Sequence, residues 1–585
     1  MGKTTQANLK CNLRYNDGYT MVQTRDSRDD LWDAFQQGLT GGLLNQSLKS
    51  CSRWAEHRRV MGAPFPGPYG FKHHPWCREI HNSKAAFTVA MKAAQLGITE
   101  AGINRAFFTL DQLKRDVLYV LPTTLNASDF SKARFATALK LSPYLKSLFV
   151  DTNTVGLKST GTNVLYIRGS RGDSNLKSIP VSELVLDELD EMDTHAIWLA
   201  LERLSGQIEK HVLAISTPTV PKYGIHKLYL TSTQEHFTFK CPHCGRWTEL
   251  VWPDCVEIIG ETVSDPRCNE SFIKCKDCGH KLEHKAKPEF LAGGIWQPTN
   301  LQANPEESRG FYCNQLYSST ISPSELVIAH FRGLGDEAAN TEFHNSKLGL
   351  PFIGEGAQVT DEMLDAAVRN HTINGLRPEI GGLRCVTMGV DQGKTGYISI
   401  VEWIFDGDRR IDINLAGLGT LLWFGKFRED DWNYLGQLMR EWQVLACVVD
   451  ADPNINDARR FARKFHGYVH LCRYRRGITA KEIAITEEDT GSPMATVDRT
   501  NWLGCTLGRF KTNPSRLLLP RDISLEYREH VKNLVRTYEK DEHGNPEAAY
   551  VSTGPDHYAH SLVYAEIALT FAAAIGGGTD IGKIL

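Results

Sequence analysis

The 585-residue sequence contains no apolar run long enough to cross a membrane. The nearest approach, residues 562–575, is interrupted by Glu566 and stays below the ~18 residues that a membrane helix needs. Residues 1–17 likewise lack the apolar core of a secretory signal. We therefore expect a cytosolic protein.

Neither positive nor negative charge is in large excess. The chain has 66 Lys and Arg against 69 Asp and Glu, a net charge of −3, so any nucleic-acid signal must be local. With 41% hydrophobic and 23% charged residues, the composition excludes collagen-like, low-complexity and wholly disordered chains. The length predicts roughly 3 to 5 domains, each with its own core.

The 14 cysteines are too few in so long a chain for a disulfide framework, but four of them form two CxxC pairs. Cys241 and Cys244 make the first pair, and Cys275 and Cys278 make the second. A glycine follows each pair and lets the turn close on a metal. Four thiolates at this spacing are typical of tetrahedral Zn²⁺, so the segment predicts a zinc ribbon. Its closed coordination predicts a structural role.

Other residues of this segment are weaker candidates. Cys255 and Cys268 have no CxxC partner, and we interpret them as spectators. Three histidines stay open as alternative ligands: His243, His280 and His284.

Residues 86–100 have the order of a phosphate-binding loop: a strand, a turn and a helix start. Gly97 allows close backbone approach, and Thr99 offers a hydroxyl for Mg²⁺. Ile98 stands where such a loop has its lysine, which leaves Lys92 as the nearby cation for the β- and γ-phosphates. Alone, the segment also fits an ordinary strand-to-helix turn with an exposed lysine.

Two later motifs favour ATP hydrolysis. An apolar run ends at Asp187 and Glu188; in an NTPase the first acid holds Mg²⁺ and the second polarises the attacking water. One strand later, residues 216–219 place hydroxyls, including that of Thr217, where they can sense the γ-phosphate. The acidic run continues to residue 193, which also fits a solvated helix start. The order of the three motifs predicts a P-loop ATPase.

A second α/β pattern, residues 386–575, carries scattered acids. Asp391 and Asp450 each end an apolar strand, and Asp556 opens a helix. Convergent carboxylates of this kind hold two Mg²⁺ or Mn²⁺ ions in phosphodiester cleavage, which predicts an RNase H-like nuclease. Each acid alone also fits a cap or surface residue. Asp452 is the alternative to Asp450, because only the register decides between them.

A basic stretch lies between the second and third acids. Residues 459–476 carry seven Lys and Arg and no acid, interleaved with aromatics. This pattern predicts a local phosphate-binding surface, although a solvated basic helix face is the alternative.

The joint order of these motifs resembles the large subunit of tailed-phage terminases, of the lambda GpA-like family, from about residue 74 to about residue 573. The matching pieces are residues 74–79, 92–100 (with Lys92, Gln95, Gly97 and Thr99), 121–123, 186–188, 216–219, 343–351, 390–391 and 449–450. The resemblance implies an ATP-binding site formed by Lys92, Gln95, Gly97, Thr99, Asp187 and Thr217, with Glu188 catalytic.

The resemblance also implies a motor that packages double-stranded viral DNA and cuts the concatemer. Its implied partners are a small terminase subunit, the portal of the procapsid and further copies in a ring. Its implied location is the host cytoplasm, transiently at the portal. Two departures stand out: Lys92 must replace the lysine absent at Ile98, and His560 occupies the position of the family's last nuclease acid. Asp556 is then the substitute, with His560 beside it.

The sequence thus predicts an α/β protein: an ASCE-type P-loop ATPase domain with a zinc-ribbon insert, followed by an RNase H-like nuclease domain. The predicted parts are an N-terminal region (1–60), the ATPase domain (61–237), the zinc ribbon (238–285), ATPase completion and linker (286–380), the nuclease domain (381–575) and a flexible tail (576–585). The alternatives are a zinc-ribbon helicase or repair nuclease, which usually keeps the loop lysine, and a transposase-like recombinase, which would not need the first 235 residues.

Overall fold

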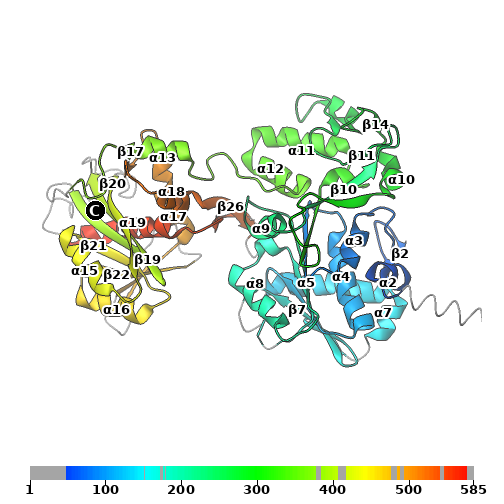
Figure 1. Cartoon of the computed structure of the whole chain (residues 1–585), viewed down its shortest axis with the longest axis horizontal. Helices are drawn as coiled ribbons and strands as arrows, with labels where there is room; N and C mark the ends of the chain where they lie inside the picture. The colour runs from blue at the N-terminus through cyan, green and yellow to red at the C-terminus, as the bar shows by residue number, and fades with distance from the viewer. Residues whose placement is uncertain are drawn as a thin grey trace, which may run out of the picture.

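The computed structural model describes residues 48–149, 152–171, 176–177, 179–376, 384–405, 417–475, 484–487, 493–540 and 546–575. Most of the predicted N-terminal region, the predicted tail and Arg476 of the basic stretch lie outside the described residues. The described chain forms two α/β lobes, and residues 350–360 pass from one to the other (Figure 1). None of the described helices combines the length and apolar character needed to cross a membrane.

The first lobe is built on an 11-stranded sheet. Its strands from β10 to β7 all run parallel, and they are buried because helices cover both faces. In spatial order these are β10 (Glu235–Lys240), β16 (Ser308–Cys313), β3 (Phe87–Lys92), β9 (His211–Ser216), β8 (Glu183–Asp187), β4 (Val117–Leu121) and β7 (Asn163–Gly169). The short antiparallel strands at the edges are β6 (Leu157–Thr160), β5 (Thr152–Asn153), β11 (Trp247–Thr248) and β15 (Ile295–Pro298).

Two apolar layers sandwich this sheet. One face packs against α2 (Cys51–Arg58), α3 (Cys77–Asn82) and α4 (Ile98–Phe108), and it includes Val185 and Ile215 of the strands. The other face packs against α8 (Thr194–Leu201) and α9 (Gly224–Leu230). Alternate residues of each strand face opposite layers, so the sheet holds its strand ends rigidly. Further helices on this lobe are α5 (Thr124–Phe130), α6 (Ala136–Leu141) and α7 (Pro143–Leu148).

The cysteine-rich segment leaves and re-enters the sheet between two paired strands. The chain departs at the end of β10 and returns in β15, which pairs antiparallel with β10. Between them lies a small sheet of β12 (Val256–Glu257), β13 (Phe272–Lys274) and β14 (Lys281–Leu282), followed by α10 (Lys287–Leu291). The segment is therefore an insertion that leaves the main sheet unbroken.

After β16 the chain forms α11 (Pro323–Gly335) and α12 (Glu337–Glu342). A capping box between Ser322 and Glu325 fixes the start of α11. Residues 343–348 then form a π-helical turn that ends at Gly349, whose φ is 65°. There is no room for a side chain at Gly349, because an added Cβ would lie 2.5 Å from the backbone nitrogen of Ala93. The turn consequently packs directly on the loop after β3.

The second lobe is built on a nine-stranded sheet. Its order is β17 (Val368–Arg369), β25 (Leu517–Pro520), β20 (Gly417–Arg428), β19 (Thr395–Phe405), β18 (Arg384–Asp391), β21 (Ala446–Asp450), β22 (Val469–Tyr474), β24 (Pro493–Val497) and β23 (Ala484–Glu487). β18, β19 and β20 are antiparallel, whereas β18, β21, β22 and β24 are parallel. The helices α15 (Trp432–Glu441) and α16 (Ile455–Lys464) cover one face; α13 (Asp361–Ala367), α17 (Arg499–Gly508), α18 (Leu525–Lys532) and α19 (His557–Ile575) lie with the other apolar layer.

A β-hairpin connects the lobes. β26 (Leu534–Lys540) and β27 (Pro546–Ser552) pair with each other and extend from the second lobe to α9 of the first (Figure 1). Val535 and Val551 pack there against Val220, with Tyr223 and Ile353 at the edge. Because this apolar cluster draws on both lobes, it fixes one against the other.

The acid that interrupts the apolar run in α19 has a buried partner. Glu566 is fully buried, and its Oε1 lies 3.0 Å from the guanidinium of Arg509, which is 3% exposed. Removing one member of such a pair leaves an uncompensated buried charge, whereas replacing both by apolar residues is often neutral.

We predict that Arg509→Met lowers the melting temperature of the second lobe by roughly 10 °C, since the lost pair costs about 3–5 kcal/mol. Adding Glu566→Leu should recover most of the loss. Calorimetry of the full chain measures both variants; a double variant no more stable than Arg509→Met would show that the pair's charge is not the cause.

Candidate functional site

The loop after β3 is held from several sides. Gln95 (φ 61°) and Gly97 (φ 74°) have left-handed backbones, and α4 begins at Ile98. The indole of Trp76 donates a hydrogen bond to the carbonyl of Leu96 at 2.9 Å. An added Cβ at Gly97 would lie 3.1 Å from the ring of His74. Residues 74–79 therefore pack against the loop and hold it in place.

Lys92 is the cation of this site. It ends β3, is only 5% exposed, and its Nζ lies 3.5 Å from Oε1 of Glu188. Ile98 points into the core and is 1% exposed, so it offers nothing to a phosphate. Thr99 follows it in the first turn of α4 and is half-buried, while Gln95 is exposed.

The sheet brings the three predicted nucleotide motifs together. β9 lies between β3 and β8; Met91 pairs with Ser216, and Asp187 pairs with Ile215. The loop after Lys92, the hydroxyl-rich residues 216–219 and the two acids therefore meet at the carboxyl ends of three adjacent parallel strands. This edge is where α/β sheets bind ligands.

One carboxylate oxygen of Asp187 accepts a hydrogen bond, and the other does not. The hydroxyl of Tyr119 donates to Oδ2 at 2.6 Å, whereas Oδ1 is buried and has no hydrogen-bond partner among the described residues. Burial and the charge of Glu188 raise the pKa of Asp187. An oriented carboxylate with one unpaired oxygen fits a metal ion or its water.

Asp190 has a different environment from Glu188. Its carboxylate accepts hydrogen bonds from Thr219, through both N–H and hydroxyl at 2.9 Å, and from the N–H of Ile225 at 2.7 Å. Burial raises its pKa to about 7. Asp190 thus ties residues 219–225 to the acidic turn. Glu188, with its side chain 38% exposed beside Lys92, is the acid that can reach water.

The four predicted zinc ligands converge. One ligand atom each from Cys241, Cys244, Cys275 and Cys278 lies within 4.8 Å of the others, and the sulfurs of Cys241 and Cys278 are 4.0 Å apart. Tetrahedral Zn²⁺ with Zn–S bonds of about 2.3 Å needs sulfurs about 3.8 Å apart, so the site fits. In the residues that the structure describes, this is the one group of three or more such ligands that meets the distance.

The turns after the two CxxC pairs, which we call the knuckles, have the same backbone conformation. The N–H of Gly245 donates to the carbonyl of Cys241, and that of Gly279 donates to Cys275, each at 2.9 Å. Both glycines are left-handed, with φ near 70° and 68°, a conformation that other residues rarely adopt. His243 and His280 stack on each other at 4.0 Å between ring centroids and are exposed, outside the cysteine group.

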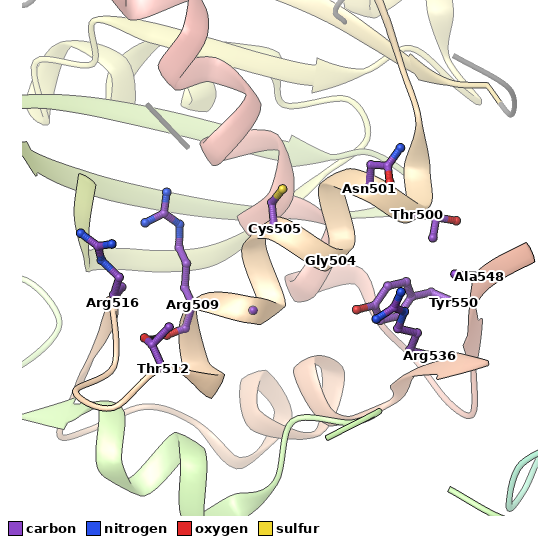
Figure 2. Close-up of a pocket in the computed structure, with 11 residues that line it drawn as sticks. Thr500, Asn501, Gly504, Cys505, Arg509, Thr512, Arg516, Arg536, Ala548 and Tyr550 are labelled. Carbon is purple, nitrogen blue, oxygen red and sulfur yellow. Dashed lines mark hydrogen bonds between the residues drawn. The ribbon is translucent and has the colours of Figure 1, made fainter. Parts of the chain in front are cut away.

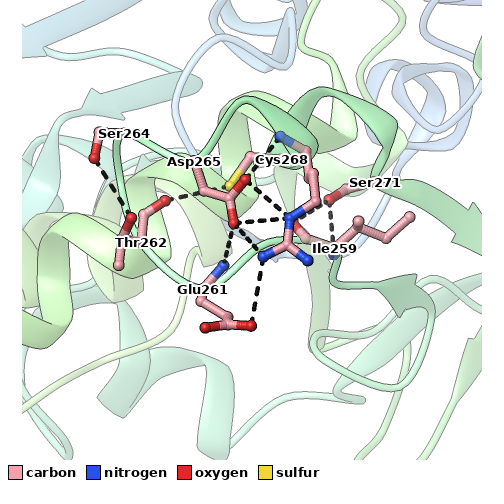
Figure 3. Close-up of polar contacts among 8 residues, drawn as sticks. Ile259, Glu261, Thr262, Ser264, Asp265, Cys268 and Ser271 are labelled. Atoms are coloured by element: carbon pink, nitrogen blue, oxygen red, sulfur yellow. Dashed lines mark hydrogen bonds and ion pairs between the residues drawn. The ribbon is translucent and has the colours of Figure 1, made fainter.

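The spectator cysteines serve the fold of the insertion. Cys268 is fully buried, and its thiol donates to the carbonyl of Thr262 at 3.4 Å (Figure 3). Asp265 caps the short helix at residues 266–270 and pairs with Arg267 at 2.7 Å in the same loop. Cys255 is also buried and donates to the carbonyl of Glu249. These contacts close the loop between the knuckles without sulfur from the metal group.

Two predicted nuclease acids are neighbours. β18 and β21 are adjacent and parallel, with Val390 paired to Val449, so Asp391 and Asp450 end side by side. Burial, followed by the charge of Asp391, raises the pKa of Asp450 to about 7. Asp452 is exposed and forms an ion pair with Arg473 at 2.9 Å, which favours Asp450 as the inward carboxylate.

Helix α19 sits directly on β18 and brings its first turn to Asp391. Gly389 allows this approach, because an added Cβ would lie 1.9 Å from the carbonyl oxygen of Ser561. The hydroxyl of Thr387 also donates to the carbonyl of Ala565 at 2.6 Å. The register of α19 is thereby fixed against the strand.

The first turn of α19 adds a histidine that the sequence analysis did not assign. Nδ1 of His557 lies 2.8 Å from Oδ2 of Asp391, and its ring stacks on Tyr397 at 4.7 Å. The hydrogen bond to Asp391 raises the pKa of His557. Its position next to Asp556 was the available signal.

Asp556 and His560 share one face of the helix, as their spacing predicted. Nε2 of His560 is 3.4 Å from Oδ2 of Asp556, and its Nδ1 is 3.1 Å from the hydroxyl of Tyr474. Burial opposes ionisation, but His560 and Arg499 hold the pKa of Asp556 below its usual range. Arg499, at the start of α17, lies 4.0 Å from Asp556 and was not singled out from the sequence.

The basic stretch divides between two elements. In α16, Ala458, Phe461 and Ala462 face the core, while Arg460, Arg463 and Lys464 are exposed. Arg473 and Arg475 belong to β22 and the residue after it. The exposed cations of the stretch therefore come from two elements.

Comparison with known proteins gives a match within the first lobe. Residues 63–296 match the family model described as phage terminase large subunit gpA, ATPase domain. The large subunit of the terminase of Escherichia phage lambda is 20% identical over 334 residues, which are 51% of this chain and 52% of that protein. The alignment spans about half the length of that relative. The resemblance to large terminases predicted from the sequence is confirmed.

Solved structures of large terminases are also similar. That of bacteriophage HK97 has a TM-score of 0.49 and 9% identity, covering 89% of this chain and 99% of its own. The large terminase ATPase domain of a Thermus phage has a TM-score of 0.29 and 15% identity, covering 49% of this chain and 95% of its own.

We predict that the freshly purified chain carries one Zn²⁺ and that Cys241→Ser loses it, because three thiolates close the site poorly. The insertion should then unfold at lower temperature. Cys268→Ser, which alters an equally buried cysteine outside the group, should keep its zinc. Elemental analysis measures all three proteins, and a parent protein without zinc would refute the site.

Proposed function

We propose that this chain is the motor subunit of a viral DNA-packaging machine: it hydrolyses ATP to translocate double-stranded DNA into a procapsid and cleaves concatemeric DNA with a metal-dependent endonuclease. The observation that carries the proposal is the pairing of two sites in one chain. One is a nucleotide site within a gpA-type ATPase domain, and the other is an acidic site on a separate sheet. Strand order β20-β19-β18-β21-β22, antiparallel and then parallel, supports an RNase H-like second lobe.

In the first lobe, the loop of Gln95 and Gly97 would surround the phosphates of ATP, and Lys92 would neutralise their charge from the strand end. Asp187 and Thr99 would hold Mg²⁺, which supplies charge neutralisation at the β- and γ-phosphates. Tyr119 keeps Asp187 oriented for this task.

Glu188 would accept the proton of the attacking water. Its ion pair with Lys92 at 3.5 Å holds the carboxylate beside the phosphate position until a nucleotide competes for the lysine. Thr217 lies just before the segment that Asp190 fastens, so a contact from its hydroxyl to the γ-phosphate would be relayed to residues 219–225.

In the second lobe, Asp391, Asp450 and Asp556 would hold Mg²⁺ or Mn²⁺, which activates water and stabilises the leaving oxygen. His560 lies against Asp556 and would either complete the ligand set or protonate the leaving oxygen. His557 orients Asp391 through their hydrogen bond. The cysteine group would hold Zn²⁺ for structure alone, since four thiolates leave no open position.

The proposed partners are double-stranded viral DNA, a small terminase subunit, the portal of the procapsid and other copies in a ring, at the portal in the host cytoplasm. The family match of residues 63–296 supports this assembly over a helicase, repair nuclease or transposase.

We predict that Lys92→Ala lowers ATP hydrolysis roughly 100-fold or more, because the charge that faces the phosphates is lost with it. ATP-driven uptake of DNA by purified procapsids should stop, while plasmid cleavage continues. The exposed Lys84→Ala serves as control and should package normally. ATP hydrolysis by Lys92→Ala at the parent rate would show that Lys92 is not the phosphate lysine. Absence of DNA uptake by the parent chain would contradict the packaging function.

We predict that Asp391→Ala and Asp450→Ala each lower plasmid cleavage with Mn²⁺ roughly 100-fold or more, with ATP hydrolysis preserved. Asp452→Ala is the matched control, and it should cut at nearly the parent rate because its carboxylate pairs outward with Arg473. Asp556→Ala and His560→Ala separate the remaining assignments. Normal cutting by Asp556→Ala together with an inactive His560→Ala would assign the third role to His560.

A further inference from the structure

A cavity of about 390 Å³ lies between α17 and the β26–β27 hairpin (Figure 2). Its size is within the range of small-ligand sites, about 300–1,000 Å³. The lining comes from α17, the turn after it and the hairpin, and it includes Gly504, Gly508, Arg509, Arg516, Arg536 and Tyr550. Figure 2 shows the arginines at both ends of this space.

The lining is positively charged. None of the described residues that line the cavity is acidic, whereas three are arginines. Arg509 is paired with Glu566 behind it, and Arg536 presents its charge to the cavity. Arg536 is exposed, with its guanidinium 5.9 Å from the ring centroid of Tyr538. Guanidinium groups bind phosphate oxygens in pairs of parallel hydrogen bonds.

The turn after α17 adds a further cation next to the lining. Burial, and then the charge of Arg536, lower the pKa of Lys511. Its Nζ donates to the carbonyl of Gly356, so this ammonium is held near the arginines by the backbone. An anion in the cavity would relieve this crowding of like charges.

The hairpin presents opposite faces to two partners. Arg536 pairs with Tyr550 across the hairpin, and both side chains line the cavity. Val535 and Val551, the paired residues next to them, point the other way into the cluster with Val220. The apolar contact thus holds the arginine-bearing face toward α17.

Two glycines keep the floor of the cavity open. Gly504 and Gly508 are four residues apart on the same face of α17. An added Cβ at Gly508 would meet nothing within 4 Å, and one at Gly504 would meet only the hydroxyl of Tyr550, at 3.9 Å. Glycine inside a helix costs about 1 kcal/mol relative to alanine. Because packing does not demand these glycines, the space they leave is available to a ligand.

The cavity begins beside the nuclease acids. Arg499 precedes Thr500, and its guanidinium donates to the carbonyl of Tyr550 at 2.7 Å while lying 4.0 Å from Asp556. A DNA strand bound along α17 would therefore continue toward Asp556 and His560.

We propose that this cavity binds a backbone phosphate of the DNA strand entering the nuclease site, with Arg536 as its main anion contact. The proposal rests on the nuclease function proposed above and adds the place where one strand of the substrate is held. Free phosphate shares this chemistry, and the experiment separates the two sources.

The test uses the full chain carrying Asp391→Ala, so that bound DNA is not cut. Anisotropy of a short fluorescent duplex is measured over a range of salt concentrations for this protein and for two additional changes. Arg536→Gln removes one charge, and Gly508→Leu fills the cavity without a backbone clash. Each should weaken binding roughly fivefold to tenfold, and Arg536→Gln should lower the slope of log Kd against log salt by about 1.

Arg440→Gln is the matched control, since Arg440 is exposed on α15, on the opposite face of the sheet. Unchanged affinity and slope in both cavity variants overturns the proposal, whereas no duplex binding by the Asp391→Ala chain overturns the nuclease function itself. Calorimetric titration with inorganic phosphate is the second arm. If Arg536→Gln alters phosphate binding but not duplex binding, the cavity is a free-phosphate site and the DNA assignment is wrong.

Discussion

Both lobes place carboxylates at the ends of buried parallel strands, where loss of water disfavours their charge. The effect is visible in the raised pKa of Asp187 and of Asp450. Each lobe offsets it in part with specific partners: Tyr119 for Asp187 and Lys92 for Glu188 in the first, and the neighbouring histidines in the second. In the function proposed above, a divalent cation would supply the remaining compensation. The geometry of both sites consequently reflects the same requirement, which is to stabilise the charge of buried carboxylates.

Meeting this demand constrains the packing around each site. In the second lobe, α19 must approach β18 closely enough for His557 to reach Asp391, and Gly389 makes that distance available. In the first lobe, the turn ending at Gly349 presses on the loop after β3, and the N–H of Ala94 donates to the carbonyl of Ser346. These small residues have no chemistry of their own, but the positions of the charged groups depend on them.

The sequence was sufficient where a site depends on local order. The CxxC spacing predicted the cysteine group, and apolar runs ending in acid predicted that Asp391 and Asp450 would be neighbours, since parallel strands end at one edge. Contacts between distant segments could not be predicted. His557 meets Asp391 across 166 residues, and Tyr119 reaches Asp187 from another strand. Neither has a pattern along the chain, because tertiary packing alone decides which side chain a buried carboxylate meets.

The β26–β27 hairpin links the surroundings of the two sites, because it contacts both lobes. Asp190, two residues after Glu188, fastens residues 219–225, and Val220 within that segment packs on Val535 and Val551. On its other face the hairpin carries Arg536, and at its end it leads through residues 553–555 into Asp556. One strand pair is thus packed against the segment that adjoins the nucleotide site and also forms a wall beside the nuclease acids. Its alternation of apolar and charged residues is what allows a two-stranded element to meet both requirements, since the valines can be buried only if the arginine faces away from them.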